Sequence, residues 1–317
     1  MKRGEFSVDT VVLEFDEALR RSRDMAAAVA AVNVLTNIIK KSNASTVMEL
    51  EKELSTTADK LQRGNPSDIS VRTACDLFLR YVGRAKDVPD FDTLKKTLIE
   101  RGTQFAHTSI HARQVIAKFG SRFIGRGVTV LVHGFSRVVQ CILEQSAHMK
   151  KEVNVVVTEG RPHNSGKDMA DFLSDLKIPC TVVSDTGVAY IMRRVDMVLV
   201  GASGVTENGG ILSRLGTYQV ALCAKALNKP FYVATESYKF SRLYPLNQYD
   251  VPKQETPVDF GPLYPEGINV VNPTRDFTPP ELISLLFTDL GILTPAAVSD
   301  ELIQMYSDGD RHREKMG

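Results

Sequence analysis

Short apolar runs alternate with amphipathic stretches through the second part of this chain, and this alternation limits the possible folds most strongly. The apolar runs are Val128–Val132, Val153–Val157, Thr181–Val183, Met197–Val200 and Pro230–Ala234. The stretches with a helical pattern are Ser136–Lys150, Ser165–Lys177, Val188–Arg194 and Arg214–Asn228. Strands joined by helices form right-handed crossovers and one parallel sheet that is covered on both faces. The sequence therefore predicts a Rossmann-like α/β domain over residues 125–317.

Apolar residues recur at helical spacing in the first third of the chain. Met25, Val29, Val32, Leu35 and Ile39 fall on one helical face. Similar patterns cover Met48–Leu61, Ser70–Val82 and Phe91–Lys118, and no strand-like alternation interrupts them. We therefore expect a helical N-terminal domain over residues 1–124 that precedes the α/β domain.

The region after the last predicted crossover is less regular. Residues 238–280 are rich in Pro, Tyr and Asn and show no sustained period, which is typical of a functional, interfacial or mobile segment. Within it, Ile268–Val271 is predicted as a last short strand. Beyond it, Leu282–Leu290 is predicted as an apolar helix that Pro279 and Pro280 begin. The polar tail Asp308–Gly317 is expected to be disordered.

Composition indicates an ordinary globular protein. The 317 residues carry a formal net charge of +1, which gives no overall attraction to nucleic acid or to acidic membranes. The four cysteines are far apart and form no C-x-x-C pair, which favours reduced thiols over a disulfide framework. The charged first residues are not followed by a signal-peptide core, so a cytoplasmic location is expected.

A glycine-rich stretch, Gly201–Gly210, follows the strand predicted at Met197–Val200 and precedes the helix predicted at Arg214. Such a turn brings backbone N–H groups close to an anion, and a helix N-terminus adds positive potential. Its only ionisable side chain is that of Glu207. The stretch therefore predicts a place that holds a phosphorylated ligand and supplies no obvious proton shuttle.

Two further turns, His133–Arg137 and Arg161–Lys167, follow the strands predicted at Val128–Val132 and Val153–Val157. Neither G-x-G-x-x-G nor a Walker A loop is present, so nucleotide binding of the usual kinds is not indicated. For the first turn alone, two explanations are equally good. Ser136 and Arg137 bind a ligand, or Ser136 is a helix N-cap and Arg137 a surface charge. Three turns at one sheet edge favour a phosphate or sugar-phosphate pocket over coincidence. The candidate ligand residues are Ser136, Arg137, Arg161, Ser165, Gly166, Lys167, Asn208, Gly209, Gly210 and Arg214.

No metal or cofactor is expected. His107 and His111 have the spacing of two zinc ligands on a helix, but the sequence offers no Glu for H-E-x-x-H and no evident third ligand. Cys141 and Cys223 lie among apolar residues and are expected to be core thiols. The basic residues of the tail are too few and too mixed with acids to indicate nucleic-acid binding.

Several motifs together resemble one known superfamily. It joins the regulatory subunits of eukaryotic translation initiation factor 2B with methylthioribose-phosphate and ribose-bisphosphate isomerases, and the chain looks most similar to the alpha-subunit group. The motifs lie at Met25–Ala31, Ser136–Val139, Ser165–Ala170, Val198–Gly210, Leu215–Thr217, Asn228–Val233, Pro245–Gln248 and Leu285–Gly291.

The resemblance also shows where the chain departs from the isomerases. By that alignment, Gly134 stands where they carry a cysteine, and Ser203 stands where they carry the aspartate of a G-A-D-R motif. A general acid or base requires a titratable side chain, which glycine and serine lack. His133 and Glu207 are nearby alternatives. The resemblance therefore implies a non-catalytic chain with no catalytic residues, and an active sugar-phosphate isomerase is the alternative.

The resemblance implies partners that composition does not reveal. Such alpha subunits form homodimers through the α/β domain and join beta, gamma, delta and epsilon subunits of the guanine-nucleotide exchange factor. They promote its assembly and help it sense phosphorylated initiation factor 2, largely through the helical domain. Sugar phosphates or nucleotide monophosphates are the implied pocket ligands, without membrane or direct nucleic-acid contact. A free metabolite-binding homodimer remains a third possibility.

Overall fold

The computed structural model describes residues 8–21, 25–65, 68–84, 90–251 and 267–307. The predicted tail at Asp308–Gly317 lies outside this part of the chain. The residues separate into two compact units, one formed by residues 1–111 with 306–317 and the other by residues 112–305. The predicted domain boundary after residue 124 stays a prediction.

The first unit is helical, as its sequence predicts. It contains α1 (Val8–Arg21), α2 (Ala27–Lys41), α3 (Val47–Gly64), α4 (Ile69–Arg84) and the first part of α5 (Phe91–Phe123). α2 is its central helix, since its alanine-rich sequence is buried on almost every side. Alanines allow neighbouring helices to approach closely, and so does Gly102 of α5, where an added Cβ would collide with Thr36 of α2. α1 is a helix that the periodicity did not predict.

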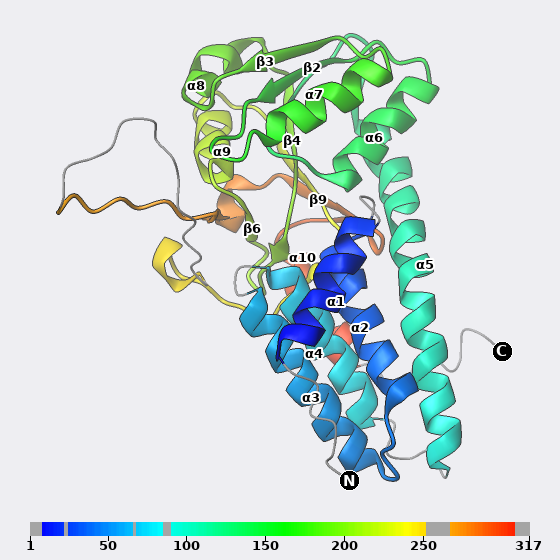
Figure 1. Ribbon diagram of the computed structural model, residues 1–317. Helices are drawn as coiled ribbons and strands as arrows, with labels where there is room; N and C mark the ends of the chain where they lie inside the picture. Colours follow the sequence, from blue (N-terminus) through cyan, green and yellow to red (C-terminus); the bar gives the residue numbers. More distant parts are fainter. Residues whose placement is uncertain (1–7, 22–24, 66–67, 85–89, 252–266, 308–317) are drawn as a thin grey trace. The chain divides into compact units, whose positions relative to one another are not determined.

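The second unit is built on a seven-stranded sheet with the order β10-β9-β7-β4-β1-β2-β3 (Figure 1). The central strands are β1 (Thr129–Val132) and β4 (Met197–Gly201). On one side follow β2 (Asn154–Thr158) and β3 (Cys180–Val183), and on the other β7 (Phe231–Ala234), β9 (Leu285–Thr288) and β10 (Gly291–Leu293). All neighbours pair in parallel except β9 and β10. The order reverses between β1 and β4, which is the switch point of a Rossmann-type sheet.

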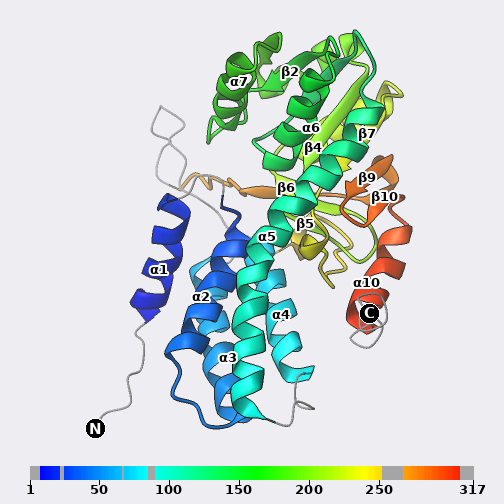
Figure 2. The same ribbon diagram turned by 90° about the vertical axis from the view of Figure 1, so that its right-hand side faces the viewer.

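Helices cover both faces of this sheet (Figures 1 and 2). On one face, the last turns of α5 pack with α6 (Arg137–His148) and α7 (Ser165–Asp175) on alternate strand residues such as Val130, Val155 and Leu199. α8 (Val188–Ile191) and α9 (Thr217–Ala226) contact each other, and α9 packs on β4 and β7. The last helix, α10, spans Ala297–Ser307. The predicted α/β fold is therefore confirmed.

The glycine-rich stretch does not lead from a strand into a helix, and this prediction is wrong. After β4 the chain forms β5 (Gly204–Val205) and β6 (Ile211–Arg214), which pair with β8 (Arg275–Thr278) in a three-stranded antiparallel sheet. α9 begins only at Thr217. Ile211–Arg214 is extended because it pairs with β8. The sequence pattern did not predict this strand, because the helix was expected to begin at Arg214.

Two further sequence predictions are corrected. The helix expected at Leu282–Leu290 is instead a short 3-10 turn, Pro280–Leu282, followed by β9. A short apolar run fits a buried helix or a buried strand equally well, and here parallel pairing with β7 decides. Ile268–Val271 is not assigned as a strand, and Ile268, Val270 and Val271 are exposed. No helix in the described ranges is long and apolar enough to span a membrane.

Candidate anion site at the carboxyl edge of the sheet

A pocket lies where β1 and β2 end, at the carboxyl edge on which Rossmann-type sheets bind ligands. We call it the β1–β2 pocket. Its lining residues come from the ends of β1 and β2, from the end of β6, and from the approach to β8: His133, Gly160, Arg161, Pro162, His163, Ser165, Arg214, Leu215, Pro273 and Thr274. It therefore brings together three predicted site residues, Arg161, Ser165 and Arg214, from separate parts of the chain.

The pocket is narrow inside and cationic at its rim. The space that water can enter is about 10 Å³, which is room for about one molecule. Arg161, His163 and Arg214 are exposed side chains at the rim. An anion larger than water must therefore bind among these side chains or displace them.

The two arginines of the rim differ in their partners. Arg161 Nε lies 3.0 Å from Glu159 Oε2 in an exposed ion pair. The backbone N–H groups of Gly160 and Arg161 donate to the Asp185 carboxylate at 3.0 and 2.7 Å, which fixes the loop. The Arg214 carbonyl oxygen accepts from the Thr217 hydroxyl at 2.6 Å, but its guanidinium forms no ion pair or hydrogen bond with the described part of the chain. Arg214 is therefore the rim cation that is available to an anion.

His133 is buried behind this rim and both of its ring nitrogens are engaged. Nε2 lies 2.9 Å from the Leu215 carbonyl oxygen and Nδ1 lies 2.6 Å from Thr158 Oγ1. A carbonyl oxygen only accepts, so Nε2 carries the proton, and the Thr158 hydroxyl donates to Nδ1 of the neutral ring. Burial lowers the pKa of His133, which favours this neutral form. Its hydrogen bonds hold His133 as a structural group and leave it no free nitrogen for proton transfer.

Two serines face the carboxyl edge without capping their helices. The Ser136 side chain makes no capping hydrogen bond to α6, and it lies against Gly201 at the end of β4. Ser136 thus stands at the switch point between β1 and β4, and Arg137 follows it as the first residue of α6. Ser165, the first residue of α7, is 8% exposed and lines the β1–β2 pocket. Ser165 therefore belongs to the lining of the β1–β2 pocket, whereas Ser136 lies against the end of β4 and does not line it.

Gly166 and Lys167 have other roles in this structure. The Gly166 N–H donates to the Glu159 carbonyl oxygen at 3.0 Å, and an added Cβ would collide with the Thr158 carbonyl oxygen. Lys167 Nζ lies 2.5 Å from Asp171 Oδ2 on the exposed face of α7. The strand–helix junction therefore uses Gly166 for close packing, and Lys167 does not line the pocket.

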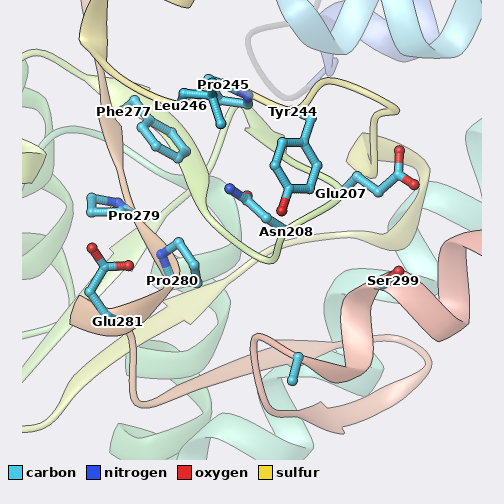
Figure 3. A pocket seen from close by; sticks show the side chains of 11 residues that line it. Glu207, Asn208, Tyr244, Pro245, Leu246, Phe277, Pro279, Pro280, Glu281 and Ser299 are labelled. Carbon is cyan, nitrogen blue, oxygen red and sulfur yellow. The ribbon is translucent and has the colours of Figure 1, made fainter.

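Asn208, Gly209 and Gly210 form the turn between β5 and β6, away from the β1–β2 pocket. Asn208 Oδ1 accepts from the Gly210 N–H at 3.1 Å and from the Thr206 hydroxyl at 2.6 Å. Asn208 also lines a separate open groove of about 470 Å³ together with Glu207, Tyr244, Phe277 and Glu281 (Figure 3). Of the three turns expected to converge, the Ser165 turn lines the β1–β2 pocket. The Ser136 turn contributes His133 to the lining but not Ser136 or Arg137, and the hairpin carries Asn208 to the separate groove.

A buried ion network lies beneath the edge. Glu236 follows β7, and its carboxylate lies 3.1 Å from Arg113 Nε and 2.7 Å from Lys239 Nζ. Lys239 also donates to the Ala202 carbonyl oxygen at 3.1 Å. Burial alone would raise the pKa of Glu236, but Lys239 and Arg113 outweigh it and lower the pKa to about 2. The network therefore ties the ends of β4 and β7 to α5.

The structure also describes Gly134 and Ser203, the two positions at which the resemblance places the catalytic residues of the isomerases. Gly134 has a φ of +73°, a conformation that side-chain-bearing residues rarely adopt. The Ser203 hydroxyl accepts a hydrogen bond from the Arg275 guanidinium. Glu207 lies in the β5–β6 turn and lines the open groove. Neither Gly134 nor Ser203 offers a group that titrates near neutral pH.

Sequence reasoning missed His163, Pro273 and Thr274 as pocket residues. His163 lies inside the predicted turn, and its neighbours Arg161 and Lys167 drew attention as cations instead. Pro273 and Thr274 lie far along the chain, and only the pairing of β6 with β8 brings them to this edge. In the described residues no group of three His, Cys, Asp or Glu side chains could hold a metal ion.

Fold and site together define a Rossmann-type α/β protein with a helical N-terminal unit and a cationic pocket at the carboxyl edge of its sheet. A sequence model of the initiation factor 2 subunit family matches residues 21–295. The chain belongs to this family.

The relatives with similar sequences include subunits of an initiation factor and isomerases. The chain is 44% identical to translation initiation factor eIF2B subunit alpha of Dictyostelium discoideum, over 94% of this chain and 97% of the relative. It is 30% identical to ribose 1,5-bisphosphate isomerase of Pyrococcus furiosus, over 93% of each chain. The crystal structure of translation initiation factor eIF-2B from Pyrococcus horikoshii OT3 aligns with a TM-score of 0.73 at 25% identity, covering 90% of this chain and 97% of that one.

Proposed function

We propose that this chain is a non-catalytic regulatory subunit of the guanine-nucleotide exchange factor for translation initiation factor 2. One observation carries the proposal. The β1–β2 pocket keeps an available cation, Arg214, and the Ser165 hydroxyl, while the resemblance places Gly134 and Ser203 at the two proton-transfer positions of the isomerases. A relative with 44% identity bears the name of the alpha subunit, which supports the same reading.

The alternative is an active sugar-phosphate isomerase, because ribose 1,5-bisphosphate isomerase is among the relatives. Isomerisation requires a group that removes a proton and one that returns it. Burial favours the neutral form of His133, whose two ring nitrogens are both engaged in hydrogen bonds, and Glu207 lines a different groove. Neither His133 nor Glu207 is therefore placed to transfer protons in the pocket, which favours ligand binding over catalysis.

The retained pocket is proposed to bind a sugar phosphate or a nucleotide monophosphate. Its phosphate group would contact Arg214 and the Ser165 hydroxyl, with Ser136 and Arg137 at the neighbouring switch point. Arg161 can join them when it leaves Glu159. Arg137→Ala is expected to weaken binding by about 1.5–3 kcal/mol, because a hydrogen bond to a charged group is lost.

The proposed partners are a second copy of the chain, bound through the α/β domain, and beta, gamma, delta and epsilon subunits of the exchange factor. The helical unit would contribute to sensing initiation factor 2 phosphorylated on its own alpha subunit. Assembly would take place in the cytoplasm. The edge strand β3 supports a protein contact, since Cys180, Thr181 and Val182 are all exposed and Val182 is 56% exposed.

Affinity capture from native cytosol tests the proposed assembly. The tagged chain is expected to recover beta and delta homologues in near-equal amounts, and native mass spectrometry should give the composition of the complex. Recovery of the chain as a homodimer without these subunits would favour the free metabolite-binding protein instead.

A further inference from the structure

His163 lines the β1–β2 pocket together with Arg214, although it was not among the predicted ligand residues. The two side chains come from different elements, His163 from the loop after β2 and Arg214 from the end of β6. Ser165 also lines the pocket and supplies a hydroxyl. An anion at the rim therefore meets an arginine, an imidazole and a hydroxyl at once.

We propose that His163 is the second cationic ligand of the anion site, and that it takes up a proton when an anion binds between it and Arg214. The inference rests on the proposed function of this pocket as an anion site. It adds a residue and a proton-linked step that the proposed function does not require.

The charged groups around His163 explain why it is neutral before binding. Burial, followed by the positive charge of Arg214, lowers the pKa of His163. Within the loop of His163, the charge of Arg161 is paired with Glu159. From the segment after β3, the Asp185 carboxylate accepts two backbone N–H bonds of that loop. From β1 the only titratable neighbour is His133, whose two nitrogens are already bonded. No unpaired carboxylate lines the pocket to offset Arg214.

A bound anion reverses this balance. Its negative charge lies close to both side chains, so it favours the protonated imidazole and raises the pKa of His163. The proton comes from solvent and stays on the ring, and no covalent bond changes. Because binding and protonation are linked, affinity must rise as the pH falls from the pKa of the bound state to that of the free state. One proton gives a slope of at most about tenfold per pH unit.

Sulfate is the probe for this linkage, because its own charge does not change near neutral pH. Calorimetric titrations of the full chain between about pH 8 and about pH 5.5 give the affinity, and paired buffers of different ionisation enthalpy give the number of protons taken up. The wild-type chain is expected to bind more tightly at the lower pH and to take up part of one proton.

Three variants separate the possible causes. His163→Gln should retain weak binding at high pH and lose both the pH dependence and the proton uptake. Arg214→Gln should lose binding at every pH. His148→Gln is the matched control, because His148 is an exposed histidine at the end of α6 and does not line the pocket; it should behave as the wild type.

The outcomes distinguish this inference from the proposed function. Sulfate binding that does not depend on pH, or a His163→Gln variant that behaves as the wild type, overturns the role of His163 and leaves the anion site intact. If neither sulfate nor a sugar phosphate binds the wild-type chain, the anion site itself is wrong, and the inference falls with it.

Discussion

At the residue scale, two polar side chains of the β1–β2 pocket are already engaged within the fold. His133 has both nitrogens bonded to the fold, and Arg161 has its guanidinium paired with Glu159. Arg214 is the rim cation that has no partner among the described residues. The proposed anion binding should therefore depend strongly on Arg214, and that dependence can be measured.

Arg214→Ala is expected to weaken sugar-phosphate binding by about 1.5–3 kcal/mol, or about 10- to 150-fold, because a charge-assisted hydrogen bond is lost. Lys167→Ala is the matched control, since Lys167 is also a predicted site residue but pairs with Asp171 outside the pocket. Titration calorimetry should find its affinity unchanged. Equal losses in both variants would show that bulk charge rather than the pocket governs binding.

Glu236→Gln should destabilise the fold by about 3–5 kcal/mol, because Arg113 and Lys239 keep their charges without the buried carboxylate. The pKa of Glu236 is about 2 in the fold, below its ordinary value of 4.5. Its contribution is therefore complete above about pH 4.5 and is lost as the pH falls toward 2.

Urea unfolding measures this effect. The difference between wild type and Glu236→Gln should be largest near neutral pH and should shrink in acid. Glu17→Gln removes an exposed ion pair with Arg21 and should cost less than about 1 kcal/mol. A difference that grows in acid would contradict the assigned role of Glu236.

At the element scale, the sequence predicts what local patterns determine and misses what distant pairing determines. Five parallel strands follow from β-branched runs between helices. β6 and β8 pair across about sixty residues, and their pairing turns the glycine-rich stretch into a hairpin. The same pairing separates Asn208 from Ser136 and Ser165, so only part of the site could be predicted. The composition of β9 also suits a helix, and the parallel pairing with β7 makes this segment a strand.

Gly209→Ala tests the hairpin turn. Gly209 has a φ of +82°, and an added Cβ would collide with the Pro295 carbonyl oxygen. Backbone strain of about 1–2 kcal/mol and overpacking of about 1–3 kcal/mol should add in the unfolding free energy. Gly127→Ala is the control, with a φ of +73° and open space around it, so only the strain should appear. If both variants lose the same stability in urea, Pro295 does not constrain the turn.

At the scale of the whole molecule, the proposed homodimer contact lies on the edge strand β3. Val182→Glu should convert the proposed homodimer to monomer, because it puts a charge into the proposed contact. Met48→Glu is the control, since Met48 is 79% exposed on α3 in the helical unit. Light scattering coupled to size exclusion gives the mass of each variant. A Val182→Glu chain that remains dimeric would move the interface elsewhere.

The central claim is that this family member keeps an anion pocket without keeping the chemistry of the isomerases. Phosphorus NMR of ribose 1,5-bisphosphate mixed with the purified chain observes binding and conversion in one sample. We expect the substrate resonances to broaden or shift and no ketose product to form above the rate without protein. Formation of product at an enzymatic rate, about 1 per second or faster, would contradict it.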